Sequence, residues 1–171
     1  MISTKIVDAL NDQIQAEFYS AYLYLSMSAY FETLNLPGFA NWMRVQFQEE
    51  QMHAMRLFDY LNERGGRVKL QAIEEPQTDW DGPQAVFSQV LEHEQHVTAL
   101  INKLVDLAVA ESDHATNAAL QWFVNEQVEE ESTADQLLQE VKLIKDSPGG
   151  LFMMDRELKS RAFTPPPDAG E

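Results

Sequence analysis

The chain has 171 residues, which is the length of a single domain. Its 12 Lys and Arg against 28 Asp and Glu give a formal net charge of −16, which argues against nucleic-acid binding because phosphate contacts need a basic surface. The absence of cysteine excludes disulfide scaffolds, thiolate zinc sites, iron–sulfur clusters and cysteine nucleophiles. The sequence has neither an apolar run of about 18 residues that could span a membrane nor a secretory signal, so we expect a cytoplasmic protein.

The positions of glycine and proline predict where helices begin and end. Residues 1–36, 39–64 and 84–147 contain neither residue type, which favours long uninterrupted helices. The third stretch is too long for one globular helix, and Ser112-Asp113 is a good N-cap signal inside it. We therefore predict four long helices at about 4–34, 38–64, 83–111 and 114–145, and a short fifth helix near 150–160.

The lengths of the connections predict how these helices are arranged. The links at 35–37 and 112–113 are short, so each predicted helix pair is expected to form an antiparallel hairpin. The link at about 66–82 is long and indicates a single crossover between the hairpins. At its end, Asp81 is the expected N-cap of the third helix. This all-α, antiparallel four-helix bundle with a short fifth helix accounts for residues 1–163, and 164–171 is expected to be a disordered Pro-rich tail.

The apolar stripe of each long helix is interrupted near its middle by a glutamate. The four residues are Glu17, Glu50, Glu94 and Glu130. Burying unpaired carboxylates together costs several kcal/mol each, and no Lys or Arg lies on these stripes to neutralise them. Either the carboxyl groups are protonated or they bind a cation. Four carboxylates with one imidazole, His53, favour a pair of divalent metal ions, with iron or manganese preferred over calcium.

The spacing of these residues repeats between the two predicted hairpins. Glu17 and Glu50 are 33 positions apart, and so are Glu94 and Gln127. Another polar residue follows three positions later in each case, His53 in the first hairpin and Glu130 in the second. Residues three apart share one helix face and can approach the same ion. This pattern indicates a two-fold-like dinuclear site between the helix pairs.

At these residues the sequence resembles the ferritins, most closely the non-haem bacterial ferritins, over residues 1–163. The residues that carry the resemblance are Glu17, Glu50-x-x-His53, Glu94 and Gln127-x-x-Glu130. It implies the ferritin-like bundle, whose carboxylate ligand pattern is already established for this class. It also implies an iron-storage protein that oxidises Fe(II) with O2 or H2O2 and stores the product as a ferric oxide mineral. The family assembles homo-oligomeric cages of twenty-four subunits.

The resemblance assigns ligands to a di-iron ferroxidase centre. Glu17, Glu50 and His53 correspond to the ligands of the first iron. Glu94, Glu130 and a bridging Glu50 correspond to those of the second.

Further residues correspond to the surroundings of that centre. Gln127 is expected to hydrogen bond a water or peroxide molecule, and Tyr24 to act as a hydrogen-bond partner or electron donor. A core aromatic role for Tyr24 is an equal alternative. Bacterial members bind a third iron, whose carboxylates correspond to Glu49, Glu126, Glu129 and Glu130; otherwise these acids form a solvated face.

Some positions depart from related families. The haem-binding bacterioferritins carry a methionine directly after the first-motif glutamate, where this chain has Gln51, so we expect no haem. His93 and His96 lie off the predicted stripe and are expected on an exposed helix face.

Acidic residues greatly outnumber basic ones in the second half of the chain. Between Lys69 and Lys142 the only basic residue is Lys103, against 15 acids. This surplus either maintains solubility or concentrates Fe(II).

The alternatives to iron storage are a non-storage di-iron peroxidase or oxygenase, and a subunit that mineralises iron without oxidising it.

Overall fold

The computed structural model describes residues 2–165, and within that range it contains five α-helices and no strand. They are α1 (Thr4–Thr33), α2 (Pro37–Glu63), α3 (Pro83–Ala110), α4 (His114–Ile144) and α5 (Pro148–Leu158). The predicted all-α bundle is confirmed, with each long-helix boundary within one residue of the predicted one. Most of the tail predicted at 164–171 lies outside the described residues.

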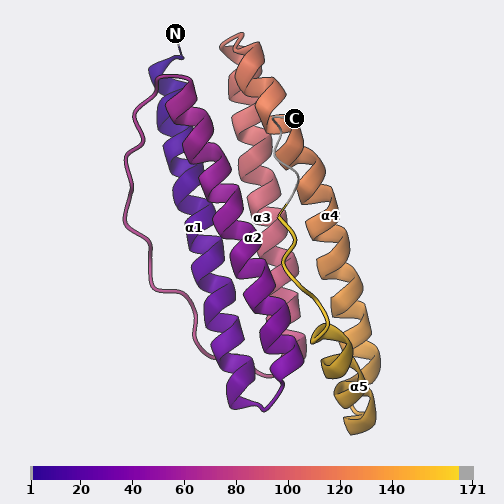
Figure 1. Cartoon of the computed structure of the whole chain (residues 1–171). Helices are drawn as coiled ribbons and strands as arrows, with labels where there is room; N and C mark the ends of the chain where they lie inside the picture. Colours follow the sequence, from indigo (N-terminus) through magenta and orange to yellow (C-terminus); the bar gives the residue numbers. More distant parts are fainter. Residues whose placement is uncertain (1, 166–171) are drawn as a thin grey trace.

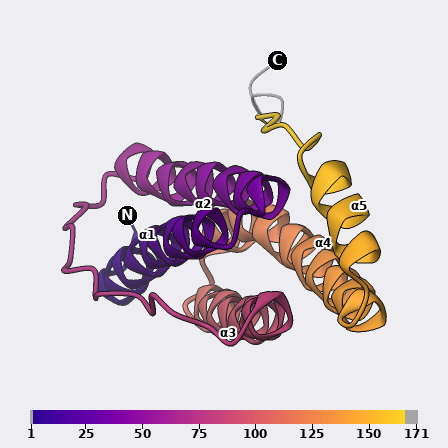
Figure 2. The same ribbon diagram turned by 90° about the horizontal axis from the view of Figure 1, so that it is seen from below.

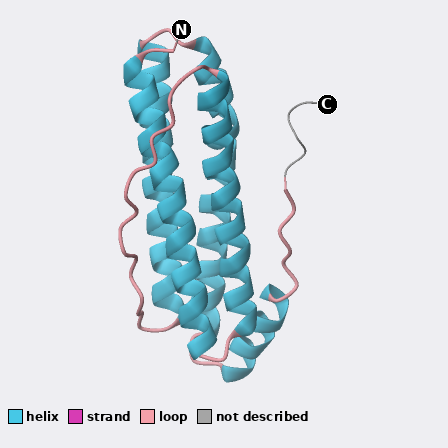
Figure 3. Cartoon of the chain, turned by 60° about the vertical axis from the view of Figure 1, so that its left-hand side comes forward, coloured by secondary structure: helices cyan, strands magenta, loops and turns pink. Residues whose placement is uncertain are grey.

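The four long helices form two antiparallel hairpins, α1 with α2 and α3 with α4 (Figure 1; viewed from below in Figure 2). The connection from 64 to 82 runs along the bundle beside α1, so α3 starts at the same end of the bundle as α2 (Figure 3). Side chains of α1 hold this connection in place. The Asn11 amide accepts from Lys69 N–H at 2.6 Å, and the Tyr30 hydroxyl donates to the Trp80 carbonyl at 2.6 Å.

Local capping explains where the helices start. Asp113 caps α4 as predicted, accepting from the backbone N–H of the first helical turn at 3.0 Å. Ser147 caps α5 in the same way, so this helix begins at Pro148, two residues before the predicted start. The prediction of Asp81 as the cap of α3 was wrong. Gly82 occupies that position with φ 93°, a backbone conformation that glycine adopts without steric penalty.

The docking of α5 replaces a missing cap on α2. Leu36, which precedes α2, has no side chain that can accept a hydrogen bond from the helix. The buried Asp155 carboxylate of α5 accepts instead from the N–H groups of Gly38 at 2.7 Å and Phe39 at 3.2 Å. Glycine is required at 38, because a Cβ there would lie 1.6 Å from the Asp155 carbonyl oxygen. These contacts fix the start of the C-terminal segment against the bundle.

The hydrophobic core is divided into two clusters. One contains the C-terminal half of α1 and the N-terminal half of α2, together with residues of α3, α4 and α5. The other contains the N-terminal half of α1, the C-terminal half of α2, and the remaining halves of α3 and α4. The layer between them is polar. It consists of the predicted ligands and their neighbours, at the middle of all four long helices.

Candidate metal centre

The four glutamates predicted to interrupt the apolar stripes all point into the bundle. Their exposed fractions are 1% for Glu17, 2% for Glu50, 1% for Glu94 and 8% for Glu130. His53 is 1% exposed and lies among them, with Nδ1 3.3 Å from Glu50 Oε2. Within residues 2–165, no Lys or Arg forms an ion pair with any of these four carboxylates. The layer therefore concentrates negative charge without a basic side chain to balance it.

Two sets of side chains bring their ligand atoms close enough to share an ion. Glu17, Glu50 and His53 each offer one ligand atom, and these atoms lie within 4.8 Å of one another. His53, Glu126 and Glu130 meet the same criterion. The two sets adjoin because they share His53. Carboxylate oxygens with imidazole nitrogen are a donor set that suits iron or manganese.

Several polar atoms in this layer are buried without a hydrogen-bond partner. Among the described residues they include Glu17 Oε2, Glu50 Oε2 and His53 Nε2. An unsatisfied buried polar atom costs about 1–3 kcal/mol, and more when it is charged. Such atoms are rare in stable cores unless a ligand satisfies them. Their convergence shows that the donor set fits a metal cation, which would remove both the unsatisfied lone pairs and the charge repulsion.

Burial and mutual repulsion disfavour ionisation of these carboxyl groups. Burial, and then the charges of Glu94 and Glu17, raise the pKa of Glu50 well above 4.5. Burial is also the main cause that raises the pKa of Glu94, although Tyr24 and Gln127 oppose it by hydrogen bonding. Burial and the charge of Glu94 raise the pKa of Glu130 to about 8. A metal ion reverses this balance, because it favours the ionised form of each ligand.

Three glutamine amides orient the carboxylates. The pairs are Gln13 with Glu17 at 2.8 Å, Gln46 with Glu130 at 2.9 Å, and Gln127 with Glu94 at 3.2 Å, the amide donating in each case. Sequence reasoning gave a role only to Gln127. Gln13 precedes Glu17 by four positions, and Gln46 precedes Glu50 by four, a helical spacing that could have identified both.

Tyr24 packs with its ring in the first apolar cluster, against Trp42, and reaches the polar layer with its hydroxyl. It is fully buried, and its hydroxyl donates to Glu94 Oε1. Burial, followed by the charge of Glu94, raises the pKa of Tyr24 well above 10, so the phenol stays protonated. Glu94 belongs to neither set of converging ligand atoms in the described residues, and its two oxygens are held by Tyr24 and Gln127 instead.

Residues 7–144 match the ferritin-like domain family. The chain is 48% identical over 161 residues to the bacterial non-heme ferritin of Bacteroides fragilis, covering 94% of this chain and 100% of that relative. It superposes on an engineered closed form of the Archaeoglobus fulgidus ferritin with a TM-score of 0.95 and 55% identity, covering 96% of this chain and 100% of that one. The chain belongs to the ferritin family. Iron storage with ferroxidase activity, the function predicted from the sequence, is confirmed by this membership.

Beyond the buried layer, this ferritin has three further predicted acidic ligands. Glu126 is half-buried and reaches the set formed with His53 and Glu130. Glu49 is half-buried and forms an ion pair with Arg161, with 2.7 Å between Oε2 and Nη2. Glu129 is exposed on α4 and is not part of either ligand set.

The prediction that both His93 and His96 lie on an exposed face was wrong for His93. His96 is exposed, but His93 is largely buried, with Nε2 2.8 Å from the Ser20 hydroxyl and its ring against Tyr19 and Tyr24. Burial lowers its pKa to about 4, so it is neutral at pH 7. His93 is covered because the face of α3 that contacts α1 extends beyond the apolar stripe and includes this side chain.

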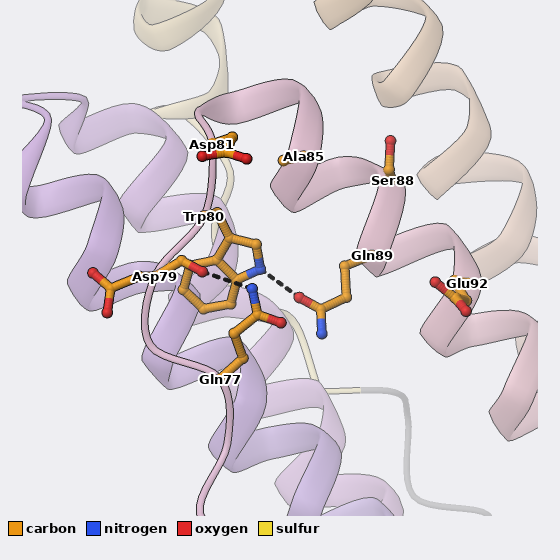
Figure 4. Close-up of a pocket in the computed structure, with 8 residues that line it drawn as sticks. All are labelled: Gln77, Asp79, Trp80, Asp81, Ala85, Ser88, Gln89 and Glu92. Atoms are coloured by element: carbon orange, nitrogen blue, oxygen red, sulfur yellow. Dashed lines mark hydrogen bonds between the residues drawn. The ribbon is translucent and has the colours of Figure 1, made fainter.

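The surface of this ferritin also has pockets, but the one in Figure 4 is not part of the metal layer. It encloses about 500 Å³ beside the start of α3, and Trp80 donates to Gln89 across it. None of the predicted ligands lines this pocket.

In the part of the chain that the structure describes, no helix is long and apolar enough to cross a bilayer.

Proposed function

We propose that this ferritin subunit performs its ferroxidase reaction at a di-iron centre in the polar layer, with Fe(II) as the substrate. Glu17, Glu50 and His53 bind one ion. Glu94 and Glu130 bind a second, with Glu50 shared between the two. The main support for this proposal is that Glu17, Glu50 and His53 each have a buried ligand atom without a hydrogen-bond partner among the described residues.

The layer is suited to oxidation as well as to binding. Carboxylates are anionic, hard ligands, so they stabilise Fe(III) more than Fe(II) and favour transfer of electrons to O2 or H2O2. Burial raises the pKa of Glu50, Glu94 and Glu130, and a bound cation favours their ionised forms, so iron binding and proton release are coupled at this layer. The five proposed ligands are at most 8% exposed, and the ferritins that the chain matches are iron-storage proteins. This disfavours the peroxidase and oxygenase alternatives.

Gln127 and Tyr24 have supporting roles in this proposal. Both donate to Glu94 and so hold its carboxylate in a fixed orientation for iron binding. Tyr24 is also placed to donate an electron during oxidation, since its hydroxyl contacts a proposed ligand directly.

The proposal extends to iron beyond the centre and to the assembly. A third iron site is formed by Glu49, Glu126, Glu129 and Glu130, supported by the approach of Glu126 to Glu130 and His53. The subunit self-associates, as ferritins do, and the cage of twenty-four subunits and the cytoplasmic location both remain predictions. The absence of haem likewise remains a prediction from Gln51.

The direct test adds Fe(II) aerobically to the assembled protein and measures both the oxidation rate and the iron retained. We expect far more than two iron atoms per chain to be retained as ferric oxide. Glu94→Ala should slow oxidation by at least about tenfold while leaving the assembly intact, because it removes a ligand of the second iron. Glu92→Ala, an exposed acid two positions earlier, is the matched control. Unchanged kinetics in Glu94→Ala would remove this residue from the centre.

A further inference from the structure

The described segment after α5 turns back in the direction of the bundle (Figure 1), and hydrogen bonds hold 158–161 beside α2. The Asn41 side-chain amide of α2 donates to the carbonyl of Leu158 at 3.3 Å and to that of Arg161 at 2.9 Å. With the Asp155 contacts at the start of α2, these bonds fix the backbone on both sides of residue 158. The side chain of Arg161 is thereby directed to one place on α2.

Arg161 is held there by two further contacts. Its guanidinium carbon lies 4.6 Å from the centre of the Trp42 ring, and Nη2 is 2.7 Å from Glu49 Oε2. The side chains of Arg161 and Glu49 are only 26% and 20% exposed, so solvent screens this ion pair less than a surface pair. The other guanidinium nitrogen, Nη1, is buried and has no hydrogen-bond partner among the described residues.

Glu49 contacts Arg161 directly and lies one helical turn before His53 on α2. Burial raises its pKa, the charge of Arg161 opposes that rise, and both His53 and Glu126 are close enough to act on it. His53 and Glu126 belong to the ligand set that includes Glu130. Arginine remains protonated at any physiological pH, so this charge can be removed from Glu49 only by moving the side chain.

We infer that Arg161 is a tethered cation that occupies the Glu49 ligand of the third iron site and lowers the affinity of that site relative to the di-iron centre. The inference rests on the proposed function, because it needs the third site to exist. An incoming Fe(II) ion has to compete with the guanidinium for the Glu49 carboxylate, whereas among the described residues no basic side chain pairs with Glu17, Glu50 or Glu94. The protein thus sets the order in which its sites fill. Arg161 is a positioning residue, since it acts through Glu49.

The test is an anaerobic titration with Fe(II) of the assembled, full-length protein, which resolves the first two binding steps from the third. Arg161→Gln should tighten the third step by roughly three- to tenfold, because it removes the competing charge, and should leave the first two steps unchanged. Arg161→Lys should stay close to the parent protein, since it keeps the positive charge. Lys159→Gln, an exposed cation two residues earlier, is the matched control and should change nothing.

A second substitution separates failure of this inference from failure of the proposed function. Glu49→Gln should weaken the third step and abolish the effect of Arg161→Gln in the double variant. If Glu49→Gln leaves the third step unchanged, the proposed third site is wrong at this residue. If Glu49→Gln weakens that step but Arg161→Gln does not strengthen it, or weakens it, the role of Arg161 is overturned and the third site stands.

Discussion

Glu130 shows how a single residue couples folding, pH and iron in this protein. Its pKa is about 8 in the folded chain against 4.5 for an ordinary glutamate, because burial and the charge of Glu94 disfavour its ionised form. The folded protein therefore holds a proton that the unfolded chain releases between these values. The stabilising contribution of this group is complete below about pH 4.5 and is lost as the pH rises through about 8.

Glu130→Gln, measured without iron, should make this dependence visible. Glutamine cannot ionise, so the Tm of the variant should match that of the parent near pH 5 and exceed it by roughly 5 °C at pH 8.5. Thermal melts at both pH values provide the measurement. Glu129→Gln is the control, because Glu129 is exposed on the same helix. A Tm difference that stays constant with pH would show that Glu130 is not held protonated by its surroundings.

Tyr24→Phe isolates the role of one hydroxyl in a buried position. The phenyl ring keeps the packing, but Glu94 loses the donor on its Oε1 atom. We expect near-normal Fe(II) binding and an oxidation rate reduced about threefold to tenfold, measured by stopped-flow absorbance. Tyr22→Phe, at an exposed position on the same helix, should be neutral. Equal rates in the two variants would leave Tyr24 as a packing residue.

At the scale of the elements, the helices and their hairpin pairing were predictable, but the contacts of the C-terminal segment with α2 were not. Gly and Pro positions, with the Ser112-Asp113 cap signal, predict the long-helix boundaries because they act locally on the backbone. The Asp155 contact with Gly38 joins residues 117 positions apart, and no periodicity within either helix indicates it. The ion pair of Arg161 with Glu49 could not be predicted either, because these residues are 112 positions apart.

Asp155→Ala should detach α5 from the bundle. The change removes the acceptor for two N–H groups at the start of α2, a loss worth about 1–2 kcal/mol. Amide hydrogen exchange over 148–158 should accelerate, and Asp155→Asn should restore most of the protection because its amide oxygen still accepts. Protection of α5 that is unchanged in Asp155→Ala would show that the helix is held by its apolar contacts alone.

In the candidate site, too, features that depend on the local sequence pattern were predictable, and features that depend on how the helices pack were not. The buried carboxylates are predictable because acids on an apolar stripe are energetically costly without a cation. The burial of His93 was not predictable from the sequence, because it depends on how closely α1 packs on α3. This packing brings the Ser20 hydroxyl to the imidazole ring.

For the whole molecule, the net charge of −16 is the dominant long-range feature. A strongly negative surface attracts Fe(II) from solution, and added salt screens that attraction beyond a Debye length of about 10 Å at 0.1 M. The initial rate of Fe(II) uptake at limiting iron should therefore fall several-fold between 0.01 M and 0.5 M salt, as followed by stopped-flow. A rate independent of ionic strength would mean that the surplus of acids serves solubility rather than iron capture.

Anomalous diffraction at the iron edge, from crystals soaked anaerobically with Fe(II), would locate the bound ions in the molecule. The buried carboxylate layer should show two iron peaks about 3.5–4 Å apart, as in other dinuclear sites. One peak should lie among Glu17, Glu50 and His53, and the other among Glu50, Glu94 and Glu130. Iron found only on the acidic surface, with no peaks in the layer between the two apolar clusters, would contradict the account.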